Sequence, residues 1–448
     1  MALTGLEIFK LLPKTNCKKC GMPTCLAFAM QLAQKRVKLD DCPDVSEEAK
    51  KTLAAAAAPP MRKVVFGSGD NQVRLGQETV MFRHEEKFYS PTVLAVAVSD
   101  KLTGQDLNKR IEAVNSLQFE RIGTKIRARA IAVINDSGQA SAFADAAATV
   151  AQAGTLALIL VSDSPQAMAA AVAKTADAVP LIAHAAADTA KEMAKIAKQN
   201  KCPLVAKANS IHDLSDLTEK IKSYGVEDIV LSLQTENLRD KLYNLSRMRA
   251  LSLKKVFRPL GYPTISFVTD GDPNHQAAVA TSLICKYSGI VVVDTAEPYV
   301  FLPVLTAVMN IFTDPQKPVQ VEPKVYPIGE PDENAPLMFT TNFSLTYYTV
   351  ESDVEASRVP SFILVVDTEG TSVLTAYSGD KLNEKTVADA MTKNNVQSLV
   401  KHRKLIIPGY VAVMSGKLEE ATNWEIMVGP RESSMLPKYL REVWRAPA

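Results

Sequence analysis

Eight short apolar runs between residues 93 and 295 place the strongest constraint on how this chain can fold. Each run precedes a longer segment whose apolar residues recur at three- and four-residue spacing, as on one face of a helix. The runs cover residues 93–99, 130–136, 156–162, 180–185, 203–208, 228–234, 264–269 and 290–295. Strands this apolar are expected where helices cover one face of a sheet and a packed interior covers the other.

Eight β–α units over roughly 230 residues have the size of a (β/α)8 TIM barrel. We therefore predict a central barrel over residues 93–322. Because the number of strands does not by itself show closure, an open doubly wound sheet stays the alternative.

Polar side chains stand at the ends of most of these runs, where barrels carry their chemistry. The candidates are Asp100, Asp136, Asp163, His184, Lys207, Asp270 and Asp294. An Asp or Ser directly after a strand is also the ordinary N-cap of the next helix, as in SDS at 162–164, and capping explains most of these residues without catalysis. The chain has no H-E-x-x-H, G-x-S-x-G or P-loop motif. We interpret the barrel as a platform for a partner or substrate and predict no catalytic residue.

Four of the six cysteines lie near the start of the chain. They are Cys17, Cys20, Cys25 and Cys42, with the spacing C-x2-C-x4-C-x16-C. One loop can direct three thiolates at a common centre, and the fourth can join them from across a helix. Only the first interval is a knuckle of the kind that structural zinc sites use in pairs, whereas three close cysteines and a distant one suit a [4Fe-4S] cluster. Zinc stays the alternative. Cys202 and Cys285 are interpreted as small buried hydrophobes.

The opening MALTGLEIFKLLP lacks the cationic start, long apolar run and cleavage site of a signal peptide. We therefore expect a cytoplasmic protein, in a reducing compartment where disulfides are rare. The net charge is +2, and no apolar run reaches the ~18 residues that a membrane span needs. These features predict neither a nucleic-acid partner nor a membrane partner.

Two proline-containing breaks indicate an α/β multidomain protein. At 52–63, an alanine run meets two prolines that end any helix, which is typical of a semi-rigid tether. The segment 313–336 has six prolines and neither a helical nor a strand period. The predicted parts are a cysteine module at 1–57, a linker with a hairpin at 58–92, the barrel at 93–322 and a further domain at 323–448.

Strand-like and helix-like segments alternate in the last domain. Small open α/β sheets bind ligands beyond the carboxyl ends of their strands. The loops DTEGTSV at 367–373 and GPRESS at 429–434, rich in backbone amides and hydroxyls, are therefore candidate ligand loops. Turn formation alone also explains both loops.

The whole layout resembles a known family, the large (gamma) subunits of the corrinoid iron–sulfur protein of the reductive acetyl-CoA (Wood–Ljungdahl) pathway. The resemblance rests on LLPKTNCKKCGMPTCLAFAMQLA with the later DDCP, and on VVDTEGTSVLTAY and IPGYVAVMSGKLEEATNWEIMVGP. It implies that the four cysteines ligate a [4Fe-4S] cluster and that a C-terminal Rossmann-like α/β domain holds a cobamide, a corrinoid of the B12 type. The positions that match the family's corrin contacts are Thr340, Thr346, Gly370, Thr371, Ser372, Val373 and Ser434.

The resemblance also implies the function of a methyl-group carrier rather than a stand-alone catalyst. A protein of this family takes a methyl group from a methyltetrahydrofolate-dependent methyltransferase and passes it to acetyl-CoA synthase. Its implied partners are a small barrel subunit, with which it forms a heterodimer, these two enzymes and a reductive activator.

A missing motif predicts how the cobalt is held. Many methyl-carrying corrinoid domains bind cobalt through the histidine of a D-x-H-x-x-G motif, and no histidine of this chain has that context. Cobalt without a protein base should be reduced more easily from Co(II) to Co(I), and the cluster would supply the electron. We expect Thr371 or a neighbour to lie under the cobalt without binding it.

Two functions of other classes stay open at this point. One is an iron–sulfur oxidoreductase that acts on a substrate bound at the barrel, which requires a catalytic constellation at the strand ends. The other is a structural scaffold with an inert zinc site.

Overall fold

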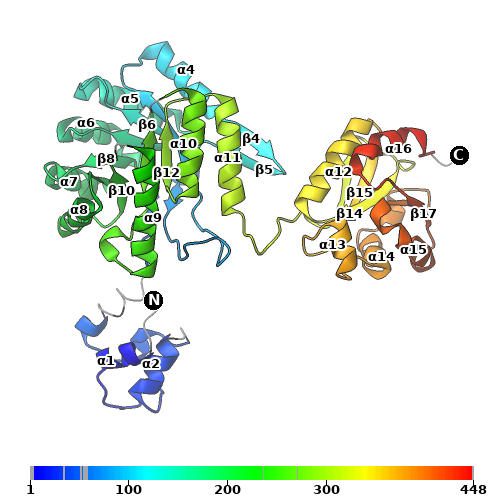
Figure 1. Ribbon diagram of the computed structural model, residues 1–448, viewed down its shortest axis with the longest axis horizontal. Coiled ribbons are helices and arrows are strands. Elements are labelled where there is room, and N and C mark those ends of the chain that lie inside the picture. The colour runs from blue at the N-terminus through cyan, green and yellow to red at the C-terminus, as the bar shows by residue number, and fades with distance from the viewer. Residues whose placement is uncertain are drawn as a thin grey trace. The chain divides into compact units, whose positions relative to one another are not determined.

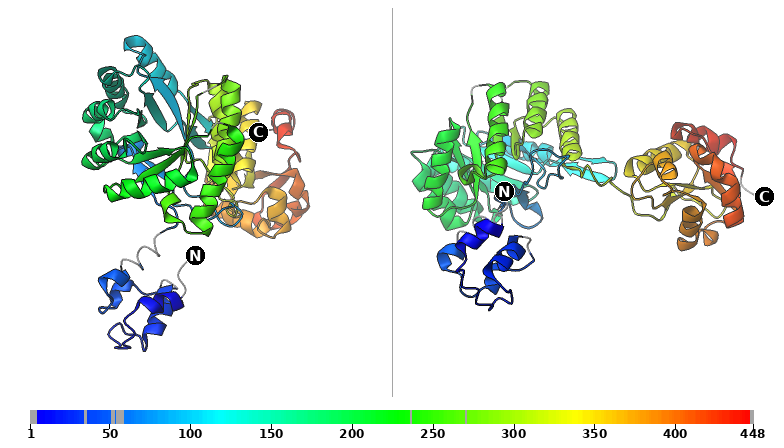
Figure 2. Two further views of the ribbon diagram at one scale, coloured as in Figure 1. Left: turned by 60° about the vertical axis from the view of Figure 1, so that its left-hand side comes forward. Right: turned by 60° about the horizontal axis from the view of Figure 1, so that its bottom comes forward.

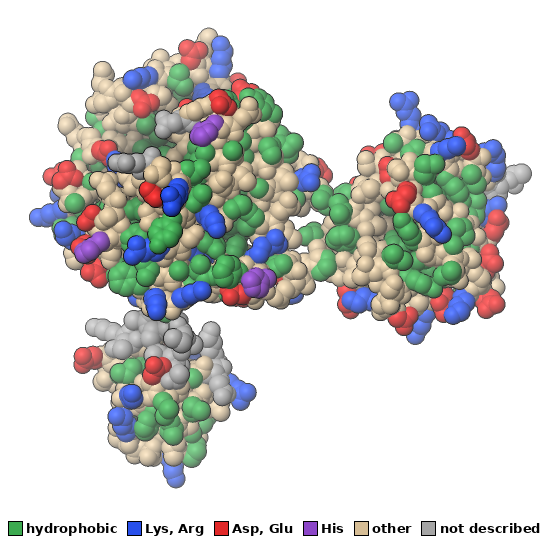
Figure 3. All heavy atoms as spheres, in the orientation of Figure 1, with side chains coloured by type: hydrophobic (Ala, Val, Ile, Leu, Met, Phe, Trp, Pro, Cys, Tyr) green, Lys and Arg blue, Asp and Glu red, His purple; other side chains and the backbone are tan. Residues whose placement is uncertain are grey.

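The structure is a computed structural model that describes residues 5–33, 36–50, 53, 59–235, 237–269 and 271–445. It divides into two compact units, Met1–Phe119 with Ile126–Phe312, and Glu120–Lys125 with Thr313–Ala448. Half of the expected tether at 52–63, and the candidate Asp270, lie outside the described residues. Figure 3 shows acidic and basic side chains interspersed on the visible faces. No helix in the described part of the chain combines the length and apolar character that crossing a bilayer requires.

The N-terminal segment has a small hydrophobic cluster of its own. Its helices are α1 (Gly5–Leu11), α2 (Cys25–Ala33) and the short 3-10 helix η1 (Leu39–Asp41). The buried members of the cluster are Ile8, Leu12, Cys25, Phe28, Ala29, Cys42, Val45, Ala49 and Leu53. Cys25 and Cys42, two of the predicted iron–sulfur ligands, are therefore part of the hydrophobic packing that holds this segment together.

Eight parallel strands form a nearly closed barrel (Figure 1). They are β3 (Val93–Ser99), β6 (Ala130–Ile134), β7 (Ala157–Val161), β8 (Leu181–Ala185), β9 (Leu204–Ala208), β10 (Ile229–Leu233), β11 (Ile265–Val268) and β12 (Ile290–Val293). Their order in the sheet is β10-β9-β8-β7-β6-β3-β12-β11, and a parallel bridge from Leu231 to Thr264 links the two end strands. Each predicted apolar run is one of these strands, so the predicted eight-stranded barrel is confirmed.

A helix follows each of the eight barrel strands, and these helices cover the outside of the barrel (Figure 2). These helices are α4 (Gly104–Asn115), α5 (Ala140–Ala153), α6 (Pro165–Thr175), α7 (Ala190–Asn200), α8 (Ile211–Ser223), α9 (Leu238–Lys254), α10 (Pro273–Cys285) and α11 (Pro298–Phe312). The short helices η3 (Ala176–Ala178) and η4 (Arg258–Leu260) follow α6 and α9, and β4 (Gln118–Arg121) pairs with β5 (Thr124–Arg127) between α4 and β6. Ser164 caps α6 by accepting a hydrogen bond from the Ala167 N–H at 3.3 Å, which confirms capping as the role of this serine.

A two-stranded antiparallel hairpin closes the amino end of the barrel. It consists of β1 (Val64–Phe66) and β2 (Val73–Leu75), with η2 (Gly69–Asn71) between them. Its buried side chains pack with the first residues of the barrel strands, such as Val93 and Ala130. The Gly67 N–H also donates to the Val179 carbonyl at 2.8 Å, just before β8 begins.

The second unit contains a five-stranded sheet in the order β13-β15-β14-β16-β17. Its strands are β13 (Val325–Ile328), which is antiparallel, and the parallel β14 (Leu337–Thr341), β15 (Ser361–Val366), β16 (Lys404–Ile407) and β17 (Glu425–Val428). The helices α12 (Ser344–Ser357) and α16 (Leu436–Glu442) pack on one face. The helices α13 (Val373–Ser378), α14 (Glu384–Lys393) and α15 (Ser415–Thr422) pack on the other, and η5 (Val396–Ser398), η6 (Gly409–Met414) and η7 (Ser433–Met435) lie in the connections.

Candidate functional site

The first candidate site is the cysteine loop between α1 and α2, together with Cys42 after η1. Thr24 caps α2 by accepting a hydrogen bond from the Ala27 N–H at 3.0 Å, which fixes Cys25 at the start of the helix. The thiols of Cys25 and Cys42 are buried, whereas Cys20 is half-buried and Cys17 is exposed. The site is thus covered by the hydrophobic cluster on one side and open on the other.

The four predicted thiols lie close enough to influence one another. Burial raises the pKa of Cys42, and the other three thiols raise it further when they are ionised. The structure therefore brings the predicted cysteines into one neighbourhood. Among the described side chains, no group of three or more His, Cys, Asp or Glu residues is arranged to hold a metal ion.

The backbone around these thiols fits an anionic sulfur-rich group. Lys14, Asn16 and Lys18 have φ values of 59°, 50° and 61°, and Gly21 has 77°, so residues in the left-handed region recur along the loop. Loops of this kind turn successive N–H groups toward one point, as in many iron–sulfur sites. The Asn16 N–H already donates to the Cys25 Sγ at 3.4 Å, while its side-chain Oδ1 accepts from the Cys25 N–H at 2.8 Å. These donors would stabilise thiolates bound to a cluster.

The second candidate site is a cavity of about 330 Å³ in the C-terminal sheet domain. It lies at the carboxyl halves of β14 and β16, against the first turns of α12 and the loop after β17. Its lining residues are Met338, Phe339, Thr340, Leu345, Thr346, Thr349, Val350, Ser372, Val373, Leu374, Ile406, Ile407, Pro408, Tyr410, Gly429, Pro430, Arg431, Glu432, Ser433 and Leu436. The lining is largely apolar. It also contains a few hydroxyls and two charged residues that are adjacent in sequence, Arg431 and Glu432.

Four of the seven predicted cofactor contacts line this cavity. They are Thr340, Thr346, Ser372 and Val373. Gly370, Thr371 and Ser434 are not among the lining residues. The Thr371 hydroxyl instead donates to the Thr368 carbonyl at 2.7 Å, and Ser434 is exposed next to the lining Ser433.

Gly370 has a structural role that sequence reasoning missed. Its φ is 75°, and a Cβ atom there would lie 2.7 Å from Gln320 Cγ and 2.9 Å from Pro318 Cβ. The missing side chain therefore makes room for the segment before β13. Asn342 holds the same loop, because its buried Oδ1 accepts from the N–H groups of Thr368 and Gly370 at 3.0 and 2.9 Å.

The loop after β16 was also missed as a ligand loop. A Cβ atom on Gly409 would lie 2.6 Å from the Gly429 carbonyl oxygen and 2.8 Å from the Arg431 nitrogen. The two loops approach this closely only because Gly409 has no side chain. Pro408 and Gly409 directly after the apolar strand gave a signal that could have identified this loop.

One polar atom of the cavity has no internal partner. The Thr340 side chain is 1% exposed, and its Oγ1 has no hydrogen-bond partner among the described residues. Because a buried hydroxyl without a partner is unfavourable, Thr340 fits a ligand that supplies a hydrogen bond inside the cavity. At the rim, the Tyr410 hydroxyl donates to Glu432 Oε1 at 2.6 Å.

None of the five histidines, all of which lie in the described part of the chain, lines this cavity. His402 is the histidine of the second unit, and it is buried. Its Nε2 lies 2.8 Å from the Ala335 carbonyl oxygen, and its Nδ1 accepts from the Lys404 N–H at 3.2 Å. Both ring nitrogens are therefore used inside the domain.

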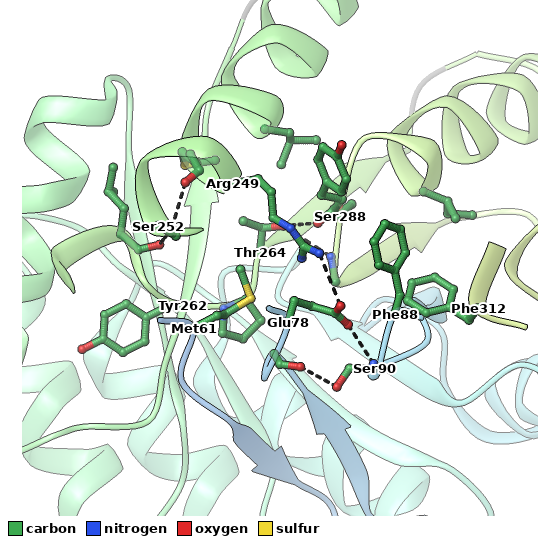
Figure 4. Close-up of a pocket in the computed structure, with 18 residues that line it drawn as sticks. Met61, Glu78, Phe88, Ser90, Arg249, Ser252, Tyr262, Thr264, Ser288 and Phe312 are labelled. Atoms are coloured by element: carbon green, nitrogen blue, oxygen red, sulfur yellow. Dashed lines mark hydrogen bonds and ion pairs between the residues drawn. The ribbon is translucent and has the colours of Figure 1, made fainter. Parts of the chain in front are cut away.

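A smaller cavity of about 40 Å³ lies at the amino end of the barrel (Figure 4). Arg249 and Glu78, each 5% exposed, form an ion pair there at 3.3 Å. Arg249 also donates to the Val80 carbonyl at 2.7 Å, and Glu78 accepts from the Ser90 N–H at 2.8 Å. The Arg249 guanidinium lies 4.9 Å from the centre of the Tyr287 ring. These contacts fix the segment after β2 to the barrel.

At the carboxyl end of the barrel, some predicted strand-end residues have structural roles. Asp100 is buried and accepts from both the N–H and the hydroxyl of Ser137, at 2.8 and 2.6 Å. Asp294 accepts from Gln276 Nε2 at 2.5 Å.

Cys285, which we expected to be buried, is exposed because it ends α10.

Comparison with known proteins finds two matching family models and relatives that align with nearly the whole chain. The model of the family "CO dehydrogenase/acetyl-CoA synthase delta subunit" matches residues 63–440, and the model "Putative Fe-S cluster" matches residues 12–43. The corrinoid/iron-sulfur protein large subunit of Moorella thermoacetica is 44% identical over 98% of this chain and 99% of its own length. The acetyl-CoA decarbonylase/synthase complex subunit gamma of Methanothermobacter thermautotrophicus is 37% identical over 98% of this chain and 99% of its own length.

These matches extend over the cysteine loop, the barrel and the C-terminal sheet domain. They confirm the family resemblance that the cysteine motif and the C-terminal motifs indicate. The chain belongs to the family of corrinoid/iron–sulfur protein large subunits and acetyl-CoA decarbonylase/synthase gamma subunits.

Proposed function

We propose that this protein is a methyl-group carrier, which accepts a methyl group from methyltetrahydrofolate through a methyltransferase and delivers it to acetyl-CoA synthase. A Rossmann-like domain at 323–448 would hold a cobamide, and Cys17, Cys20, Cys25 and Cys42 would hold a [4Fe-4S] cluster. The observation that carries the proposal is the 330 Å³ cavity at the carboxyl edge of the C-terminal sheet, with the unpartnered hydroxyl of Thr340 inside it. Family membership supports a corrinoid as the class of ligand proposed for this cavity.

When bound, the cobamide would supply a cobalt centre that accepts and donates a methyl group, and the cluster would supply single electrons that keep this cobalt reduced. Thr340 would hydrogen-bond the cobamide, and the apolar side chains of β14, β16 and α12 would exclude water from it. Ser372 and Val373 would contact it from the loop after β15.

The histidine positions support a cobalt without a protein ligand. Both ring nitrogens of His402 already have partners in the domain. The other four histidines belong to the first unit. A threonine hydroxyl near the cobalt, from Thr371 or a neighbour, would be too weak a ligand to replace an imidazole.

The cysteine loop would hold the cluster with two buried and two more accessible thiolates. The N–H···S contact from Asn16 to Cys25 would stabilise negative charge on the sulfur. The Lys19–Asp44 ion pair at 3.0 Å ties the loop to the segment after Cys42. Exposure of Cys17 leaves one side open to an electron donor.

The proposed partners are a small barrel subunit, the methyltransferase, acetyl-CoA synthase and a reductive activator. The names of the relatives, as a large subunit and as a subunit of a complex, support assembly with other chains. Exposed apolar residues also lie on and beside the cavity rim. Leu345 (53% exposed) and Leu374 (52%) are lining residues, and Met435 (50%) directly precedes the lining Leu436. A ligand and a partner together would cover such a surface.

The proposal is tested by the absorption spectrum of anaerobically purified protein. Corrin bands together with a broad iron–sulfur shoulder are expected. The shoulder alone would favour an iron–sulfur oxidoreductase. A spectrum that lacks both features would contradict the presence of both cofactors.

The substitution Cys42→Ala separates the electron-relay role of the cluster from the methyl-carrier role of the cobamide, because it removes a proposed cluster ligand. We expect loss of iron and a fall of more than about tenfold in the rate of reductive reactivation, with methyl transfer from pre-reduced protein largely retained. Cys285→Ala is the matched control, since Cys285 is exposed on α10 and outside the cysteine loop. An equal loss of both activities in Cys42→Ala would contradict the division between relay and carrier.

A further inference from the structure

The carboxyl end of the barrel holds a cluster of polar side chains outside the sites described above. Its members are Asp163 just after β7, His184 in β8 and Lys207 in β9, and these three strands are neighbours in the sheet. Both carboxylate oxygens of Asp163 accept from Lys207 Nζ at 2.9 Å, and one of them lies 3.5 Å from His184 Nδ1. The three side chains form one connected group.

His184 is the buried member of this group, with 8% of its surface exposed. Its ring meets the ring of Phe267 edge-on, with the centres 5.2 Å apart. Phe267 belongs to β11, and β9 and β10 separate that strand from β8 in the sheet. The contact therefore crosses the mouth of the barrel and places the imidazole inside it.

The protonation of His184 leaves one nitrogen as an acceptor. Burial lowers the pKa of His184, so the imidazole is neutral at pH 7. The nearby Asp163 carboxylate favours the tautomer that carries the proton on Nδ1. Nε2 then has a free lone pair, and this buried atom has no hydrogen-bond partner within the described structure.

Two further buried oxygens at this end of the barrel lack partners in the described part of the chain. They are Asn135 Oδ1, just after β6, and Thr235 Oγ1, just after β10. The Asn135 Nδ2 donates to Ser162 Oγ at 2.9 Å, which leaves the carbonyl end of the amide as the unsatisfied one. The Thr235 hydroxyl can donate as well as accept, whereas Asn135 Oδ1 and the lone pair of His184 Nε2 can only accept. Unsatisfied buried acceptors are rare and unfavourable, so these two atoms indicate a ligand that supplies donors.

The charges at the mouth narrow the class of ligand. Next to the imidazole, Asp163 and Lys207 neutralise each other, and the Lys241 ammonium already donates to the Phe267 backbone carbonyl at 3.0 Å. We propose that the carboxyl end of the barrel binds a small, planar, uncharged molecule with N–H donors, of the primary amide or amino-heterocycle class, whose donors reach His184 Nε2 and Asn135 Oδ1. The ring of Phe267 supplies an apolar wall. The inference is independent of the proposed function, because these residues lie in neither the cysteine loop nor the C-terminal cavity.

Four benzene derivatives that differ in their polar group test the ligand class on the full-length protein. The probes are benzamide, benzoate, benzamidine and methyl benzoate, and the readout is the histidine side-chain spectrum of ¹⁵N-histidine-labelled protein. Benzamide should shift the His184 Nε2 resonance with a dissociation constant on the order of millimolar, as expected for a fragment of this size. The anion, the cation and the ester should leave the resonance unchanged at the same concentration. An equal shift with benzoate would overturn the assigned class, and no shift with benzamide would overturn the site.

Substitutions of His184 and Asn135 test whether these residues contact the ligand. His184→Asn keeps a donor toward Asp163 but removes the Nε2 acceptor, and it should weaken benzamide binding about tenfold. His212→Asn is the control, because the His212 side chain is 83% exposed on α8 and its loss should not change binding. Asn135→Ala removes the second acceptor and decides the matter if His184→Asn does not fold. Unchanged affinity in the folded variants would contradict the proposal.

Discussion

Two cavities in the described part of the chain differ in what their polar groups do. In the 40 Å³ cavity at the amino end of the barrel, Arg249 and Glu78 have their partners within the fold. In the 330 Å³ cavity of the C-terminal sheet, the Thr340 hydroxyl has none among the described residues. Polar groups that satisfy one another stabilise the native state, whereas a group left without a partner is available to a ligand. The polar groups of the first cavity therefore stabilise the fold, whereas the second cavity has the unpartnered hydroxyl that the proposed binding site requires.

The largest expected effect comes from breaking the buried ion pair with Arg249→Met. An uncompensated Glu78 carboxylate would remain buried, so the free energy of unfolding should fall by about 3–5 kcal/mol. Arg247→Met is the matched control, because Arg247 is exposed two residues earlier on α9, and it should change stability by less than ~0.5 kcal/mol. Urea denaturation of both variants measures the difference. Similar small effects in the two would remove the structural role assigned to this cavity.

A smaller effect, now on binding, is expected from Gly409→Ala. The new Cβ would press on backbone atoms of the loop after β17 at 2.6 and 2.8 Å, so the cavity edge must move. Such overpacking costs about 1–3 kcal/mol, and we expect cobamide affinity to fall roughly tenfold. Gly416→Ala is the control, since a Cβ atom there meets nothing within 4 Å. Absorbance titration with cobamide distinguishes them, and equal affinities would show that this edge does not contact the ligand.

The smallest effect is expected from Thr340→Val, which removes one hydroxyl and keeps the shape. Loss of a hydrogen bond worth about 1 kcal/mol should weaken cobamide binding roughly fivefold. The empty protein should lose no stability, because the hydroxyl has no partner there among the described residues. Thr341→Val is a close control, since its buried hydroxyl is likewise unpartnered in the described structure but does not line the cavity. Equal weakening in both would contradict a direct contact from Thr340.

Much of the fold follows from local sequence patterns. The eight barrel strands could be predicted because each is a short apolar run buried on both faces, and Ser164 could be recognised as a cap from its place after β7. The cysteine spacing identified the residues that the N-terminal segment gathers. These features depend on neighbours along the chain, which the sequence displays directly.

The walls of the C-terminal cavity could not be predicted in the same way. Leu345, Thr349 and Val350 line it because α12 packs on one particular face of the sheet, which its own sequence does not determine. Gly370 stays a predicted cofactor contact, but its role in making room for Pro318 and Gln320 could not be read from its own loop. Contacts between distant segments decide both cases.

Asn342 affects how fast a ligand can bind at the carboxyl edge of the C-terminal sheet. Its fully buried side chain joins the end of β14 to the loop after β15 through hydrogen bonds to Thr368 and Gly370. The entropy lost in ordering that loop is therefore lost when the chain folds, not when a ligand arrives. A ligand meets this part of the edge already in its final conformation, so its arrival rate is set by diffusion and orientation rather than by loop closure.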